Sequence, residues 1–219
     1  MSEVIGQREE RRALLRGGRR YIVAYGCARA WATLTFTGTQ SAAATAAMTA
    51  PWSFNPHLTF DAGYIAIGIL LLLCFRRVIP LNEHRLVRAG AAAGMLLASA
   101  ACVAAPWFPE ATFSLIVGGS LAAGVGYGLF LLLAAEVLCT FSLLRIFLFL
   151  SGAMLLGAVI TFFCRGLTAP QSQVMLVGLP VLAMLYLRTA YERVPEVDRP
   201  KRGVPKFSYP WKLFALYGL

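Results

Sequence analysis

Six long apolar blocks, separated by short polar connections, most constrain what this chain can fold into. A helix needs about 20 mostly apolar residues to cross a bilayer, and each block approaches or exceeds that length. Hydrophobic residues make up 58% of the chain and charged residues only 14%, whereas globular domains usually contain about 25% charged residues. The blocks are Tyr21–Thr49, Leu58–Phe75, Val87–Ala105, Thr112–Leu138, Ile146–Cys164 and Ser172–Leu187. The pattern predicts an all-α polytopic membrane protein with six transmembrane helices.

The positions of the basic residues predict the orientation of these spans. Eighteen of the Lys and Arg residues fall in the N-terminal segment, in alternate connections and after the sixth span, whereas the other connections hold only Arg165. Basic residues gather on the cytoplasmic side of membrane proteins. Both ends of the six-span region are therefore expected in the cytoplasm, and the protein in the inner (plasma) membrane. A cleaved signal peptide ending in "SAAATAAMTA" is the disfavoured alternative, because the chain starts with twenty residues that include acids.

Four segments follow from this plan. They are a basic cytoplasmic segment (1–20), a six-helix bundle (21–190), a Pro-rich basic linker (191–212) and the apolar "LFALYGL" (213–219). The last segment is expected to begin a seventh span, as if a second half were missing.

The first span carries a polar stripe that a purely lipid-facing helix would not have. Arg29, Thr33, Thr37 and Ser41 recur every four residues, so they occupy one sector of a helix. Charged residues inside membrane spans usually face protein or water. The stripe is expected to line a cavity, although the hydroxyls can also bond to their own helix carbonyls.

Glu136 is the predicted partner of Arg29, because both residues are expected toward the cytoplasmic side of neighbouring spans. The alternative places Glu136 near the headgroups, where it pairs with Arg145. The first interpretation predicts a buried ion pair beside the cavity.

Small residues at four-residue intervals predict close helix packing in the third and fourth spans. Such ridges let helix backbones approach each other. The residues are Gly90, Gly94, Ser120, Gly124 and Gly128. Leu71, in contrast, is expected to face lipid.

No motif indicates an enzyme, a metal site or a cofactor. A P-loop, GxSxG and HExxH are missing from the sequence. The five cysteines are scattered singly, without the spacing of metal ligands. The bilayer and an unidentified small-molecule ligand are the expected partners.

The six spans and the basic linker resemble one half of a major facilitator superfamily transporter. The resemblance implies a 3+3 inverted repeat in which the first and fourth spans line the central cavity. After the second span that family has a loop of the form Gly-x-x-x-Asp-(Arg/Lys)-x-Gly-(Arg/Lys)-(Arg/Lys). Here "CFRRVIPLNEHRLVRAG" keeps basic residues but lacks the Asp and the second Gly.

The chain is also similar to bacterial LuxR-type helix-turn-helix regulators that have a facilitator-like membrane region. The likeness rests on "GVGYGLFLLLAAEVLCTFS" and on the linker ending "YPWKLFALYGL". It implies the N-terminal membrane sensory half of such a regulator, which awaits a second six-helix bundle and does not itself bind specific DNA. The alternative is the N-terminal half of a transporter of small molecules.

Overall fold

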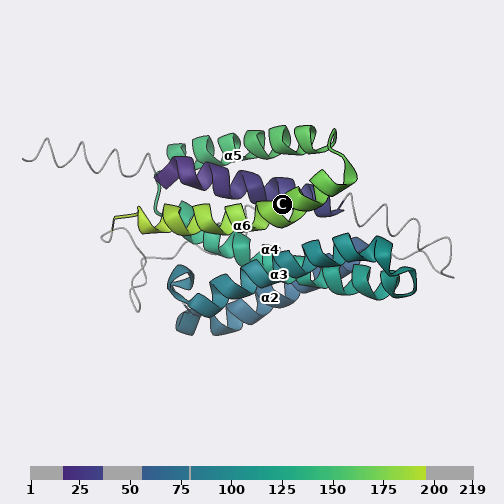
Figure 1. The fold of residues 1–219 in the computed structure, drawn as a ribbon. Coiled ribbons are helices and arrows are strands. Elements are labelled where there is room, and N and C mark those ends of the chain that lie inside the picture. Colours follow the sequence, from purple (N-terminus) through teal and green to yellow (C-terminus); the bar gives the residue numbers. More distant parts are fainter. Residues whose placement is uncertain (1–16, 37–55, 79, 196–219) are drawn as a thin grey trace, which may run out of the picture.

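The computed structural model describes residues 17–36, 56–78 and 80–195, which form a bundle of long helices (Figure 1). We call the helix over residues 17–36 the N-terminal helix. The other long helices are α2 (Pro56–Val78), α3 (Arg85–Ala104), α4 (Thr112–Leu138), α5 (Leu143–Cys164) and α6 (Ala169–Glu192). Short 3-10 turns flank α3, and no strand occurs among the described residues. The predicted all-α class is confirmed for this part of the chain.

The helices begin and end close to the predicted span limits. The fourth span matches α4 at both ends, whereas α6 extends beyond Ser172–Leu187 in both directions. Polar interactions at its two ends account for the longer helix. A capping box between Thr168 and Gln171 starts the helix, and an ion pair between Arg188 and Glu192 supports its last turn. Thr37, Ser41, the basic residues before Gly17, most of the linker and residues 213–219 lie outside the described residues.

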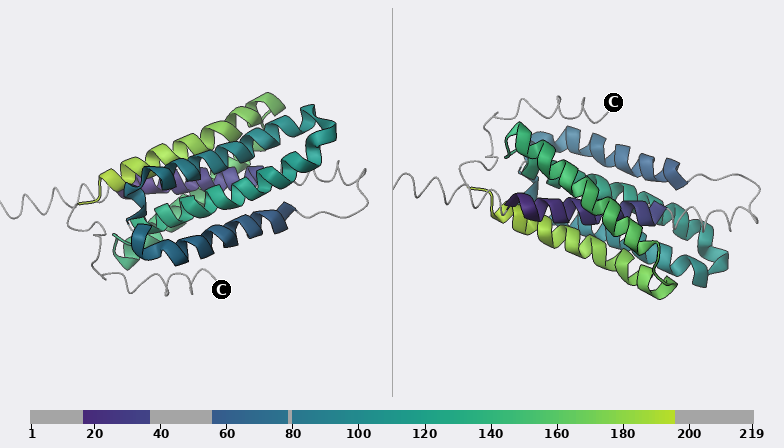
Figure 2. Two further views of the ribbon diagram at one scale, coloured as in Figure 1. Left: turned by 90° about the horizontal axis from the view of Figure 1, so that it is seen from below. Right: turned by 90° about the horizontal axis from the view of Figure 1, so that it is seen from above.

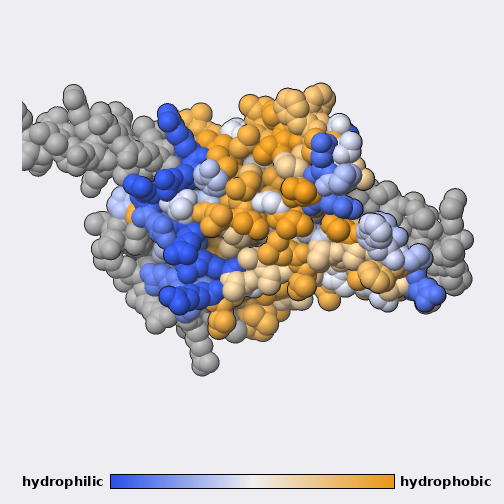
Figure 3. All heavy atoms as spheres, in the orientation of Figure 1, coloured by the Kyte–Doolittle hydropathy of each residue, from blue (hydrophilic) through white to orange (hydrophobic). Residues whose placement is uncertain are grey.

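Four stretches in the described part of the chain are long and apolar enough to cross a membrane. They are Arg85–Trp107, Pro109–Leu138, Leu143–Cys164 and Ala169–Glu192, and α2 adds a shorter apolar stretch over Pro56–Leu71. The face shown in Figure 3 carries a broad apolar belt between two more polar ends. These are the features of a helical membrane protein, and the full set of six spans stays a prediction.

Close backbone contacts bring α4 against both α2 and α3. A Cβ added at Gly124 would lie 2.1 Å from the carbonyl oxygen of Phe60 in α2, and one at Gly94 would lie 2.7 Å from the Cα of Gly126. Only glycine permits these approaches, because any side chain would overlap the neighbouring backbone. Leu71 also belongs to this core. It is only 8% exposed, so the expectation that it faces lipid is wrong.

The N-terminal helix packs in the same manner against α5. A Cβ at Gly26 would lie 3.1 Å from the carbonyl oxygen of Ala153, and one at Gly157 would lie 3.1 Å from the carbonyl oxygen of Gly26. Figure 2 shows α5 crossing over the N-terminal helix on one face of the bundle, with α2 beside α4 in the opposite view. The N-terminal helix therefore lies in the middle of the bundle.

Candidate functional site

Arg29 lies at mid-depth on the N-terminal helix. It follows Tyr21, the first residue of the predicted span, by eight residues, which corresponds to about 12 Å along the helix axis. The hydrocarbon core of a bilayer is about 30 Å thick, so in that predicted span Arg29 lies well inside either surface. The side chain is exposed in the bundle. Its first carbons lie against Gly157 of α5, and its guanidinium lies near the Tyr127 side chain of α4.

The opposite side of the same helix is buried and holds a polar connection. Trp31 follows Arg29 by two positions, so their side chains leave the helix about 200° apart. Trp31 is 0% exposed, and its indole Nε1 donates a hydrogen bond to the Ser99 hydroxyl of α3 at 2.8 Å. Arg29 therefore points away from α3.

Ser99 also links this hydrogen-bonded pair to α6. Its hydroxyl lies 2.7 Å from the Leu176 carbonyl oxygen, which it can donate to. Pro180 stands four residues later and has no N–H, so the α-helix leaves that carbonyl without its usual donor. Ser99 also lies 3.1 Å from the Met95 carbonyl oxygen of its own helix. Since a hydroxyl carries one proton, it donates to one of the two carbonyls at a time.

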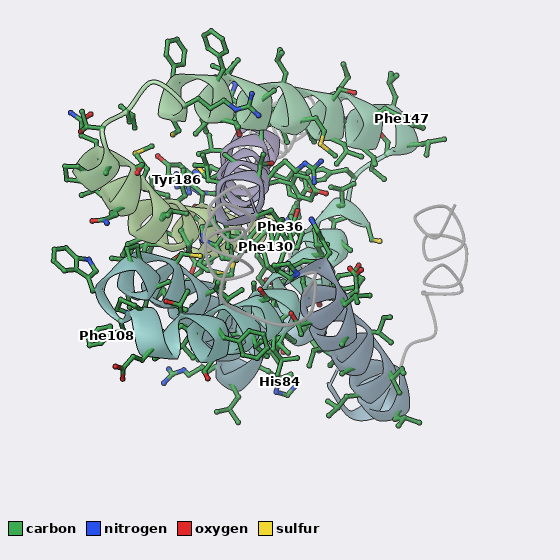
Figure 4. The ribbon with its side chains drawn as sticks, turned by 90° about the vertical axis from the view of Figure 1, so that its right-hand side faces the viewer. Phe36, His84, Phe108, Phe130, Phe147 and Tyr186 are labelled. Atoms are coloured by element: carbon green, nitrogen blue, oxygen red, sulfur yellow. The ribbon has the colours of Figure 1, made fainter. Side chains whose placement is uncertain are left out.

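A chain of aromatic rings lines the bundle beside Arg29. Tyr127 is its centre, because its ring lies between 6.2 and 6.3 Å from those of Trp31, Phe60 and Phe130. Phe60 in turn meets Phe36 edge to face at 4.6 Å. In Figure 4, Phe36 and Phe130 lie near the centre of the bundle, whereas Phe147 lies at its outer edge. The guanidinium of Arg29 thus adjoins an aromatic wall.

Glu136 has a different neighbourhood near the C-terminal end of α4. Its Oε2 accepts hydrogen bonds from both the backbone N and the side-chain Nδ2 of Asn82, each at 2.8 Å. Asn82 is 1% exposed, and its Nδ2 also donates to the Leu133 carbonyl oxygen at 3.0 Å. Arg88 donates to the Asn82 carbonyl oxygen. This cluster fastens the connection between α2 and α3 to α4.

The structure does not bring Arg29 and Glu136 together. Among the described residues the ion pair found is that of Arg188 with Glu192, and neither Arg29 nor Arg145 pairs with Glu136. Arg29 and Glu136 do not meet because they lie at different heights along the bundle. Arg29 meets α4 at Tyr127, and Glu136 lies nine residues further along that helix, which is about 13 Å.

The other predicted site residues that the structure describes are Thr33 on the N-terminal helix and the small residues of α3 and α4. The Thr33 hydroxyl donates to the Arg29 carbonyl oxygen at 3.0 Å, as in the alternative where the hydroxyls bond to their own helix. Gly94, Gly124 and Gly128 lie at helix contacts, and a Cβ at Gly90 would lie 3.2 Å from the Leu129 side chain. Ser120 is buried on α4.

Neither thiols nor histidines form a metal centre in the part of the chain that the structure describes, where no three His, Cys, Asp or Glu side chains gather. The described cysteines are unpaired, and Cys27 and Cys164 are buried. His57 stacks on Phe36 with ring centres 4.8 Å apart.

Sequence reasoning missed the two polar connections, at Asn82 and at Ser99. A signal for Ser99 did exist. Pro180 in a predicted span implies a carbonyl four residues earlier that needs another donor, but the sequence does not say which helix supplies it. Asn82 had no comparable signal, because loops are rich in asparagine.

Comparisons with known proteins give no relative for this chain. No family model matches it, and no curated protein or solved structure matches it either.

Proposed function

We propose that this chain is the N-terminal six-helix half of a facilitator-like membrane region, serving as the sensory half of a LuxR-type regulator. One observation carries the first part, namely the pairing of the helices. In a 3+3 inverted repeat, the first span corresponds to the fourth, the second to the fifth and the third to the sixth. A contact between the first and fifth spans then implies one between the fourth and second.

The contacts among the described helices agree with this exchange. The N-terminal helix meets α5 at Gly26 and Gly157, and α4 meets α2 at Gly124 and Gly63. Both pairs use glycine for close approach. The remaining pair, the third span with the sixth, corresponds to itself under the exchange. In the structure α3 meets α6 through the Ser99 hydroxyl.

The connection between α2 and α3 favours sensing over transport. It lacks the Asp and second Gly of the transporter signature, and Asn82 ties it to α4 with buried hydrogen bonds. A connection fixed to its own half suits a region that reports a bound ligand by a small rearrangement. The N-terminal half of a transporter is the second candidate, because exposed Arg29 lies on a helix that lines the cavity in that family.

The complete coding sequence and a gene deletion test the proposal together. We expect a second group of six spans followed by a basic helix-turn-helix segment. We also expect the deletion to change the transcription of a small set of genes without reducing solute uptake. A reading frame that ends after the twelfth span, combined with lost uptake of one solute, would establish transport instead.

A further inference from the structure

We propose that Arg29 binds the carboxylate of a small aromatic acid on the bundle face between α2 and α5. The inference deepens the proposed function, because it names the ligand class that this membrane half would sense. Four elements meet there. The N-terminal helix supplies Arg29 and Phe36, α2 supplies Tyr64, α4 supplies Tyr127, and α5 supplies the small residue Gly157.

Charge is the first argument, since Arg29 is exposed at mid-depth without a carboxylate partner among the described residues. The five described acids are Asp61, Glu83, Glu110, Glu136 and Glu192. None of them pairs with Arg29, and the only described ion pair is formed by Arg188. An arginine inside a membrane span is costly unless an anion or water compensates it. A bound carboxylate would supply that compensation, and a guanidinium can hold it with two parallel hydrogen bonds.

The neighbouring hydroxyl supports the same ligand chemistry. Tyr127 is 7% exposed, so only a small part of its side chain reaches the face, and its hydroxyl lies beside the Arg29 guanidinium. A phenolic hydroxyl can donate to a carboxylate oxygen while the guanidinium binds the same group. The two donors come from different helices, so they define one position for an anion.

Aromatic rings on the same face indicate the rest of the ligand, and Phe36 follows Arg29 by seven residues, which places both on one side of the N-terminal helix, about 10 Å apart along its axis. Tyr64 is 40% exposed and lies over Phe60 with nearly parallel rings, 6.4 Å apart. Phe36 is half-buried and meets Phe60 at 4.6 Å. Partly exposed rings beside a cation offer both stacking and charge recognition to a planar anion. Gly157 packs against the Arg29 stem on the other side, because a Cβ there would lie 3.1 Å from the Arg29 Cβ.

A lipid phosphate has the same charge but the wrong depth. Arg29 lies about 12 Å along the axis from Tyr21, where the predicted span starts, inside a core about 30 Å thick. Lipid headgroups lie at the surfaces. We therefore choose the free aromatic acid and use the lipid as a control in the test.

The test measures binding of salicylate to the purified chain in neutral detergent, by isothermal titration and by thermal stability. Salicylamide keeps the ring but removes the charge, octanoate keeps the charge but removes the ring, and phosphatidylglycerol supplies a lipid phosphate. The variants are Arg29→Gln, Arg29→Lys and Tyr127→Phe. Arg165→Gln is the matched control, because Arg165 is an exposed arginine at the end of α5.

We expect salicylate to bind and to raise the melting temperature, with salicylamide, octanoate and the lipid each at least about tenfold weaker. Arg29→Gln should weaken salicylate binding by about tenfold or more, Arg29→Lys by less and Tyr127→Phe by about threefold, whereas Arg165→Gln should not change it. Arg29→Lys and Tyr127→Phe keep the test decisive if Arg29→Gln does not fold. Absence of salicylate binding, equal binding of octanoate or the lipid, or binding unchanged in the Arg29 variants would overturn the inference. The coding-sequence test is independent of this result, so the two failures are distinguishable.

Discussion

Single side chains decide how the connections of this bundle are held, and Asn82 is the clearest case. Its backbone N and Nδ2 both donate to Glu136, and Nδ2 also donates to the Leu133 carbonyl oxygen. A buried amide is stabilising only when its donors are satisfied, and here they are. The connection between α2 and α3 is therefore held by hydrogen bonds to α4 as well as by apolar packing.

Replacing Asn82 by Ala should destabilise the protein more than replacing its neighbour Glu83 by Ala. The first change removes the hydrogen bonds that Nδ2 donates to the Leu133 carbonyl and to Glu136, and the loss of such buried bonds costs about 1–3 kcal/mol. Glu83 is exposed and serves as the matched control. The measurement is thermal stability in detergent, including the double variant with Glu136→Ala. Strictly additive losses for Asn82 and Glu136 would show that the two side chains do not act together.

Pairs of helices are the next scale, and glycine sets their separation. Gly124 and Gly118 lie on the same helix, but a Cβ at Gly118 meets nothing within 4 Å, whereas one at Gly124 would lie 2.1 Å from the Phe60 carbonyl oxygen. We expect Gly124→Ala to lower the folded yield and melting temperature strongly, because backbone atoms of α2 would have to move. Gly118→Ala should be neutral or slightly stabilising, since alanine favours the helix. Similar tolerance at both positions would refute the packing argument.

The proline in α6 gives a second prediction for an element. Ser99→Ala removes the donor for the Leu176 carbonyl and the acceptor for the Trp31 indole. We expect a loss of about 1–2 kcal/mol, with Ser151→Ala on exposed α5 as the neutral control. Pro180→Ala restores a backbone N–H for Leu176. In that background Ser99→Ala should cost less, and an unchanged cost would mean that Ser99 does not replace the missing helical bond.

For the molecule as a whole, the sequence predicted the helices far better than their contacts. The length of the apolar block and the Pro and Gly residues around it were enough to predict both ends of α4, because helix formation in a membrane is determined locally. The partner of Glu136 was not predictable in this way. It depends on the depth at which two helices meet, and the close approaches at Gly94 and Gly157 set that depth. For the same reason, the polar stripe located Arg29 but not Tyr127.

The distribution of charge over the whole bundle predicts which end faces the cytoplasm. The N-terminal helix begins where α6 ends, because Gly17 lies near Ala190 and Arg20 donates to the Thr189 carbonyl oxygen at 3.5 Å. The described arginines at this end are Arg19, Arg20, Arg85, Arg88, Arg145, Arg188 and Arg193, and the opposite end has Arg165. Such an excess belongs on the cytoplasmic side.

Single cysteines in a background without the native ones should therefore be labelled from opposite sides. Asn82 is unsuitable as a labelling site because it is 1% exposed, so Glu83→Cys and Ser142→Cys, both at exposed positions, are used for the arginine-rich end. Glu110→Cys and Gly166→Cys, also at exposed positions, are used for the other end. In intact cells a membrane-impermeant maleimide should label Glu110→Cys and Gly166→Cys at once, and the other two only after permeabilisation. Labelling of Glu83→Cys in intact cells would reverse the orientation, and labelling of all four would mean that the helices do not span the membrane.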